Sequence, residues 1–360
     1  MPEEKYKVAV IGCGMMGVHY VEAYSTFPDT DIVAIADTNP ERLKNIGERF
    51  GIKARYIDTQ ALLREIVPDI VAVITPTKYY KEAVIACAEA GVKGISVDKP
   101  IGAILADVDE MIKICETRGV VFAGGNVQRA MPEVQEAARR IHNSEFGELL
   151  GASLHGWGTE ISGGGNQEIN VLRLFTDAEV DEVIAWATPV AGISPYALSP
   201  NIDVGWVING RFHLTNGLDC PVFWQEMPGR RGVEVWSKND MVRWNWAPPD
   251  IFQGYDAYGV RKRIDPQYKT FKWSRFGYLG GSIRSFLAAV GTGSDLWISG
   301  HDLRQALEVA IAAKLSSDLG NVPVKLPLED RSLRLYPSRY RWEGRGVSGH
   351  QIDESQTRPR

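Results

Sequence analysis

The chain has 360 residues, about twice the length of an ordinary domain, so we expect two domains with a substantial core in each. Apolar residues make up 44% and charged residues 24%, a balance that excludes a disordered chain. The formal charge of −5 disfavours a nucleic-acid binder, because such proteins must neutralise phosphates.

The four cysteines are scattered, with no CxxC pair and no metal-ligand spacing. They indicate apolar fillers in a reducing compartment, and we expect no metal site. The first apolar run is too short for the core of a signal peptide, and no segment approaches the ~20 apolar residues of a membrane span. The sequence therefore predicts a cytoplasmic protein that contacts neither membranes nor nucleic acid.

Residues 5 to about 125 alternate between short β-branched runs and amphipathic stretches. Runs of strand length are 8–11, 32–36, 70–74 and 94–97, and 105–118 has helical spacing that ends at Gly119. Strands that alternate with helices are typical of βαβ units. This pattern predicts an α/β fold with a doubly wound parallel sheet in residues 1–125.

Beyond residue 148 strands predominate. We expect them at 149–157, 203–214, 219–227, 231–237 and 241–246, followed by an amphipathic helix at 301–319. The basic and aromatic segment 250–280 predicts an edge strand or a lid. These patterns indicate a C-terminal α+β domain, residues 126–330, with an open and mainly antiparallel sheet. Residues 331–360 contain seven arginines and predict a solvated tail, or an arm that reaches a neighbouring subunit.

The segment Gly12-Cys13-Gly14-Met15-Met16-Gly17 fits the pattern GxGxxG, directly after the first predicted strand. Asp37 lies 20 residues beyond Gly17, at the end of the second predicted strand, where a carboxylate can accept hydrogen bonds from the adenosine ribose. This is the dinucleotide fingerprint of a Rossmann domain. Asp37 would repel a 2′-phosphate, so we expect NAD as the cofactor, and Arg42 leaves tolerance of NADP open.

Two further motifs follow strand ends: Thr75-Pro76 and Val97-Asp98-Lys99-Pro100. Ligands of open α/β sheets bind beyond the carboxyl ends of the strands. The chain resembles the glucose–fructose oxidoreductase / inositol dehydrogenase / MocA family of nicotinamide-dependent sugar oxidoreductases. The resemblance rests on the fingerprint, on these two motifs, on the QRAMP segment (128–132) and on the end of the 300–327 stretch.

The resemblance implies that Lys99 contacts the substrate oxygen beside the nicotinamide, with Asp98 in place of the family's glutamate. It also implies an oligomer, and we expect a homodimer or homotetramer through the C-terminal sheet. Tyr80 stands where the family often has a histidine. The candidate cofactor-binding residues are therefore Gly12, Gly14, Met15, Met16, Asp37, Thr38, Arg42, Thr75, Pro76, Tyr80, Asp98, Lys99 and Gln128.

The chain departs from the family in the segment 162–175. The family usually carries an Asp and a His one helical turn apart after a GG segment, and this segment has neither. Asn166 and Asn170 are one turn apart and can hold hydroxyl groups, but an amide is no base near neutral pH. Proton transfer then falls to Lys99, to a tyrosine or to a histidine such as His155. Glu168 is a weaker candidate, which we expect on the helix surface.

The substrate side is expected in the second domain, where most of the tryptophans gather and can pack on sugar rings, with Trp157 as the first choice. Lys99, His155 and Asn170 are the candidate catalytic residues. The candidate substrate-binding residues are Lys99, Arg129, Trp157, Asn166, Gln167, Asn170 and Arg173.

Three hypotheses follow. The first is an NAD-dependent oxidoreductase that moves a hydride between nicotinamide and a secondary hydroxyl of a sugar, polyol or glycoside. The second is an NAD-dependent glycoside hydrolase that cleaves a neutral or anionic glycoside by transient oxidation, elimination and re-reduction, with no net redox change. The third is a non-catalytic NAD-binding regulator, which the intact Lys99 disfavours.

Overall fold

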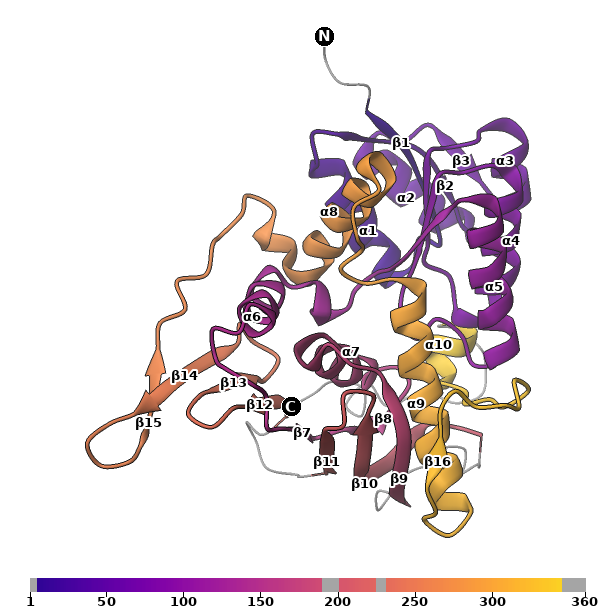
Figure 1. The fold of residues 1–360 in the computed structure, drawn as a ribbon. Coiled ribbons are helices and arrows are strands. Elements are labelled where there is room, and N and C mark those ends of the chain that lie inside the picture. Colours follow the sequence, from indigo (N-terminus) through magenta and orange to yellow (C-terminus); the bar gives the residue numbers. More distant parts are fainter. Residues whose placement is uncertain (1–4, 190–200, 225–230, 345–360) are drawn as a thin grey trace.

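The computed structural model describes residues 5–189, 201–224 and 231–344, and places two sheets one below the other (Figure 1). The first sheet has six parallel strands in the order β3-β2-β1-β4-β5-β6. The strands are β1 (Tyr6–Ile11), β2 (Thr30–Ala36), β3 (Ala54–Tyr56), β4 (Ile70–Val73), β5 (Gly94–Val97) and β6 (Val121–Gly124). The four predicted strands of this half are confirmed, and β3 and β6 were not predicted.

Helices cover both faces of this sheet, which explains why its strands are continuous apolar runs. On β1, Ala9 and Ile11 belong to one core, and Val8 and Val10 belong to the other. The connecting helices are α1 (Met15–Thr26), α2 (Pro40–Phe50), α3 (Thr59–Glu65), α4 (Tyr80–Ala90) and α5 (Leu105–Arg118). The doubly wound parallel sheet is thus confirmed, and α5 has the predicted bounds.

The second sheet has ten strands in the order β15-β14-β13-β12-β7-β11-β10-β9-β16, with β8 paired to β10. Its pairs are antiparallel except β11 with β7. The strands are β7 (Gly151–His155), β8 (Gly158–Glu160), β9 (Val180–Pro189), β10 (Val204–Leu214), β11 (Asp219–Phe223), β12 (Gly232–Trp236), β13 (Met241–Trp244), β14 (Asp250–Tyr255), β15 (Arg261–Ile264) and β16 (Val324–Lys325). The open, mainly antiparallel sheet is confirmed.

The prediction of an edge strand in 250–280 agrees with β14 and β15, which form one edge of this sheet. The long strand β9 was not predicted. The last residues of the predicted strand 219–227 lie outside the described residues.

Five helices of the second half of the chain position the site. They are α6 (Pro132–His142), α7 (Asn166–Thr176), α8 (Gly277–Thr292), α9 (Gly300–Asp318) and α10 (Arg339–Glu343). Helices α7 and α9 pack on the large sheet, where Ile169, Leu303 and Leu307 join one core. Helix α8 instead packs on the first domain, where Leu279 and Phe286 contact the core that includes Val8 and Val10. Within the described ranges, none of the helices combines the length and apolar character needed to cross a membrane.

The arginine-rich segment after residue 330 is not a solvated tail where the structure describes it. Arg331 forms ion pairs with Asp109 (2.7 Å) and with Glu308, and Leu335 is buried. The expectation of a solvated tail is therefore wrong for Arg331 and Leu335, because the fold supplies Asp109 on α5 and buried Glu308 on α9 as partners, whereas Arg334 is exposed as expected. Residues 345–360 lie outside the described residues, and the division of the chain at residues 125 and 330 stays a prediction.

Candidate active site

The turn between β1 and α1 has the backbone that a dinucleotide requires. Gly12 has φ +97°, and a Cβ there would press on the backbone of Ile74. A Cβ on Gly17 would collide with the carbonyl oxygen of Gly12, so helix and strand pack closely at this point. A Cβ on Gly14 would meet nothing within 4 Å, which leaves room for a ligand at the N-terminus of α1. A pyrophosphate fits here, since the free N–H groups and the helix dipole favour an anion.

Asp37 lies at the carboxyl end of β2 and closes the opposite end of the turn. Its carboxylate accepts hydrogen bonds from the backbone N–H groups of Cys13 (2.7 Å) and Asn39 (2.8 Å). The guanidinium of Arg42 lies 3.7 Å from the same carboxylate. The backbone thus fixes the acid where a ribose would lie, and Arg42 is close enough to face a 2′-phosphate.

A cavity of about 690 Å³ runs along the carboxyl ends of these strands. It brings together all the predicted cofactor-binding residues except Gln128. The predicted residues that line it are Gly12, Gly14, Met15, Met16, Asp37, Thr38, Arg42, Thr75, Pro76, Tyr80, Asp98 and Lys99. Gln128 is buried elsewhere, and its side-chain oxygen accepts from the indole N–H of Trp244 (3.2 Å).

Lys99 lies in this cavity just beyond β5. Its ammonium donates to the carbonyl oxygen of Asn126 (3.0 Å) and lies 3.9 Å from the carboxylate of Asp98. Burial lowers the pKa of Lys99; Asp98 opposes this change and Arg341 adds to it. A lowered pKa favours the neutral amine of Lys99, the form that can accept a proton.

Gln167 connects α7 to this lysine. Its side-chain amide donates to the carbonyl oxygen of Asn126 (3.3 Å), the same atom that accepts from Lys99. Its side-chain oxygen accepts from the backbone N–H of Gln128 (2.6 Å). Gln167 therefore holds the loop after β6 in place and does not line the described cavity.

Glu168 is fully buried, so the expectation that it lies on the helix surface is wrong. Its Oε1 accepts from the guanidinium of Arg231 (2.9 Å) and from the indole of Trp246 (2.9 Å). Its Oε2 has no partner among the described residues. Burial raises the pKa of Glu168 although Arg231 lowers it, and the carboxylate acts electrostatically on Lys99. Helix α7 is buried on all sides between two domains, which the sequence of one helix cannot reveal.

A second pair of acids, which sequence reasoning missed, lies at β8: Glu160 is partly buried and Asp203 is fully buried. Glu160 accepts from the guanidinium of Arg341 (2.7 Å) and from the backbone N–H of Ser338 (3.0 Å). Asp203 accepts from the backbone N–H of Ser162 (2.7 Å) and from its hydroxyl. Burial and the charge of Glu160 raise the pKa of Asp203, whereas Arg341 holds that of Glu160 low despite burial.

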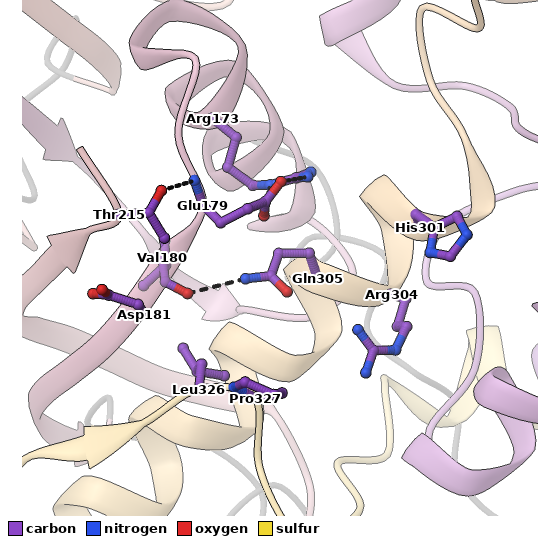
Figure 2. Close-up of a pocket in the computed structure, with 10 residues that line it drawn as sticks. All are labelled: Arg173, Glu179, Val180, Asp181, Thr215, His301, Arg304, Gln305, Leu326 and Pro327. Atoms are coloured by element: carbon purple, nitrogen blue, oxygen red, sulfur yellow. Dashed lines mark hydrogen bonds and ion pairs between the residues drawn. The ribbon is translucent and has the colours of Figure 1, made fainter.

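Arg129 and Arg173, both predicted to bind substrate, form hydrogen bonds and ion pairs with other residues of the protein. Arg173 donates to Asp302 (2.8 Å), to Asn170 (3.1 Å) and to Glu179 (2.7 Å). Arg129 donates to the carbonyl oxygens of Trp297 and Asn170. Figure 2 shows Arg173 turned toward Glu179 beside a smaller cavity of about 340 Å³, which is lined by residues of α9 and β9 and by none of the predicted cofactor residues. These contacts join α7 to α9 and leave neither guanidinium facing the cofactor cavity.

The two asparagines of α7 also bond to each other. The amide of Asn170 donates to the side-chain oxygen of Asn166 (2.7 Å), and both residues are fully buried. The amide nitrogen of Asn166 has no partner among the described residues. Neither asparagine lines the cofactor cavity, so the structure does not bring Asn170 to Lys99.

His155 and Trp157 lie away from Lys99. Ala152 and Leu154 of β7 face the core, so alternation places His155 on the other face of the sheet. There its Nε2 lies 2.9 Å from the hydroxyl of Ser153, and its ring stacks on Phe223. Trp157 is fully buried edge-on against Phe212 and donates to the carbonyl oxygen of Gly165. None of the tryptophans lines the cofactor cavity, so the role of Trp157 as a sugar platform stays a prediction.

Comparison with known families identifies the first domain. Residues 6–125 match the family model described as "Oxidoreductase family, NAD-binding Rossmann fold", the model of the glucose–fructose oxidoreductase / inositol dehydrogenase / MocA family. The resemblance found in the sequence is thus confirmed, and the nucleotide of this domain is NAD.

Two curated relatives match about two fifths of the chain. The D-apiose dehydrogenase of Paraburkholderia graminis is 32% identical over 144 residues, which are 40% of this chain and 38% of that enzyme. The myo-inositol 2-dehydrogenase of Thermotoga maritima is 30% identical over 142 residues, 39% of this chain and 42% of that enzyme. The chain therefore spans about two fifths of the length of the curated relatives it matches.

Solved structures share the whole fold. A levoglucosan dehydrogenase in complex with NADH superposes with a TM-score of 0.76, covering 90% of this chain and all of that one at 18% identity. At this identity the similarity concerns the fold alone, and it extends over both sheets.

Proposed function

Because residues 6–125 form an NAD-binding domain of the glucose–fructose oxidoreductase / inositol dehydrogenase / MocA family, we propose that the protein is an NAD-dependent oxidoreductase of sugars, polyols or glycosides. One observation carries the proposal: a buried lysine, Lys99, lies in the cavity that the fingerprint glycines and Asp37 open. A surface lysine at a strand end would have neither this burial nor this position.

In the proposed reaction a secondary alcohol binds with its oxygen at Lys99. When bound, NAD supplies the acceptor for the hydride that leaves the carbinol carbon. The neutral amine of Lys99 takes the hydroxyl proton and becomes an ammonium, while the carbon–oxygen bond becomes a carbonyl. In reverse, the ammonium stabilises the charge that develops on the oxygen and returns the proton.

The neighbours of Lys99 support this role. The carbonyl oxygen of Asn126 and the carboxylate of Asp98 keep its amine oriented at the cavity wall, and Gln167 fixes the Asn126 loop. On α7, the buried carboxyl group of Glu168 acts electrostatically on this lysine. Glu168 lies in the segment where the family's Asp and His are missing. We propose that Lys99 performs the proton transfer and that His155, on the far face of the sheet, has no part in it.

A redox-neutral glycoside hydrolase is the second candidate, and Glu168 favours it. After oxidation of a glycoside, elimination needs a base for the carbon-bound proton next to the new carbonyl. A buried carboxyl group with one oxygen unpartnered among the described residues, and a raised pKa, is suited to that proton. The two candidates share the oxidation step at Lys99.

The test is a panel of aldoses, polyols and glycosides incubated with NAD, monitored for NADH absorbance and for released free sugar. Net NADH formation supports the dehydrogenase, and free sugar without NADH supports the hydrolase. Lys99→Met should lower either rate at least 100-fold, because general acid–base groups contribute roughly 10²–10⁴-fold. The exposed Lys113→Met is the matched control. An unchanged rate in Lys99→Met would refute the assignment.

We also propose a cytoplasmic homodimer or homotetramer that associates through the large sheet. Trp186 and Phe223, on β9 and β11, are large apolar side chains exposed on this sheet, 49% and 42% respectively. Light scattering of the purified protein measures its mass directly, and a monomer at micromolar concentration would contradict this proposal.

A further inference from the structure

The C-terminal segment, residues 333–344, crosses from one domain to the other. The backbone N–H of Leu335 donates to Ala103 in the first domain (2.8 Å). The next residue, Tyr336, accepts from the backbone N–H of Asp203 in the second domain (3.0 Å). Figure 1 shows α10, which follows, lying between the first domain and the large sheet. The segment is therefore bonded to both sides of the cleft.

Helix α10 then forms part of the cofactor cavity. Its residues Tyr340, Arg341 and Glu343, with Gly344, line the same cavity as Gly12 and Lys99. Gly344 has φ +88°, and a Cβ there would lie 2.8 Å from the ring of Pro76. The C-terminal segment thus packs directly on the Thr75-Pro76 turn, at the end of the cavity that contains Lys99.

Arg341 is held at this place by a partly buried acid. Its Nε donates to Glu160 (2.7 Å), whose other oxygen accepts from the backbone N–H of Ser338. The two terminal nitrogens of Arg341 have no hydrogen bond within the part of the chain that the structure describes. The guanidinium acts electrostatically on Lys99, Asp98 and Asp203.

We propose that the C-terminal segment is a component of the active site and that the pair Arg341–Glu160 sets the charge that faces the nicotinamide ring. This inference rests on the proposed function, since it needs NAD bound with its nicotinamide toward Lys99. Arg341 is a positioning residue in this sense: it acts on the cofactor and on Lys99 through its charge.

The charge of this end of the cavity matters because the nicotinamide ring is cationic in NAD⁺ and neutral in NADH. Lys99, Arg341 and Asp98 line this end of the cavity, and the acids Glu160, Asp203 and, from α7, Glu168 act electrostatically on the two cations from behind its wall. Removing Arg341 leaves the carboxylate of Glu160 without its guanidinium, so the site becomes more negative and favours the cationic ring. Removing Glu160 has the opposite effect.

The experiment measures Kd for NAD⁺ and for NADH by calorimetry on the full chain and on four variants: Arg341→Gln, Arg341→Lys, Glu160→Gln and the double variant Glu160→Gln/Arg341→Gln. Arg334→Gln, an exposed arginine of the same segment, is the matched control. The ratio Kd(NAD⁺)/Kd(NADH) is the readout, because loss of packing alone would weaken both forms equally.

We expect the ratio to fall about tenfold in Arg341→Gln and to rise in Glu160→Gln, as for one unit charge about 12 Å from the ring at an effective dielectric constant of about 20. Arg341→Lys and the double variant should stay within about threefold of the wild type, because each keeps the net charge of the pair. Equal ratios in Arg341→Gln and Arg334→Gln would overturn the inference. A wild-type protein that binds neither form of the cofactor would instead contradict the proposed function.

Discussion

Gly14→Ala separates the fold of the phosphate turn from its function. Gly14 is the N-cap of α1 and has φ −74° and ψ −168°, an extended conformation that alanine also adopts. A methyl group there would meet nothing within 4 Å, so folding has no steric cost. Alanine is the poorer N-cap, but it also loses less entropy on folding, and the two effects nearly cancel. We expect the free energy of unfolding to change by at most about 1 kcal/mol.

Cofactor binding responds differently, because the new methyl group occupies the space through which a pyrophosphate would approach the N-terminus of α1. A displaced phosphate loses at least one charge-assisted hydrogen bond, worth about 1.5–3 kcal/mol. The Kd for NADH should therefore rise by at least about tenfold.

The assay combines urea unfolding with NADH titration. Gly51→Ala is the control: Gly51 has φ +71° in open space, so alanine costs roughly 1–2 kcal/mol of stability there while NADH affinity stays unchanged. Wild-type affinity in a folded Gly14→Ala protein would show that the phosphates do not lie at this helix.

Three further predictions concern the network and the ribose acid. Arg173→Met removes the closer of the two arginine partners of buried Asp302 and should cost about 1.5–3 kcal/mol in urea unfolding, the range for a hydrogen bond to a charged group, whereas exposed Arg139→Met should not move the midpoint; an unchanged midpoint in Arg173→Met would contradict the role assigned to this ion pair. Burial raises the pKa of Asp302, but its arginine partners and Ser299 lower the pKa by a larger amount, so it lies below its usual value. The stability that ionised Asp302 contributes is then fully present above the unfolded pKa of about 3.9 and is lost as pH falls through the lower folded pKa. Asp302→Asn should therefore flatten the loss of stability below pH 4, measured by urea unfolding at several pH values. An equal dependence of stability on pH in the variant and the wild type counts against this prediction. Asp37→Asn removes the charge and keeps an acceptor oxygen for only one of the two N–H groups, of Cys13 and Asn39, that the carboxylate now holds. The ratio of NADPH to NADH affinity should rise, and a constant ratio would mean that Asp37 does not face the ribose.

The sequence predicted the first half of the site because local rules govern it. A GxGxxG turn, an acid at the end of the next strand and two motifs at strand ends meet at one edge of a parallel sheet whatever the rest of the chain does. That is why one cavity holds Gly12, Asp37, Thr75 and Lys99. The strands of the second domain were also predictable, since alternation and β-branched runs depend on neighbours in the chain.

The partners of buried polar groups could not be predicted in this way, because they come from distant segments. Helix α7 is enclosed between two domains, so Asn170 and Arg173 bond within the protein and Glu168 is buried against Arg231. The sequence predicted Arg341 as a solvated charge, whereas in the structure its guanidinium donates to Glu160, which lies 181 residues earlier in the chain.

By itself, then, the sequence determined the nucleotide fold, NAD and the lysine at the strand end, all of which follow from short-range pattern. Only the tertiary structure decided which charges surround that lysine. A buried charge must find a partner wherever the fold supplies one, and sequence separation says nothing about where that is.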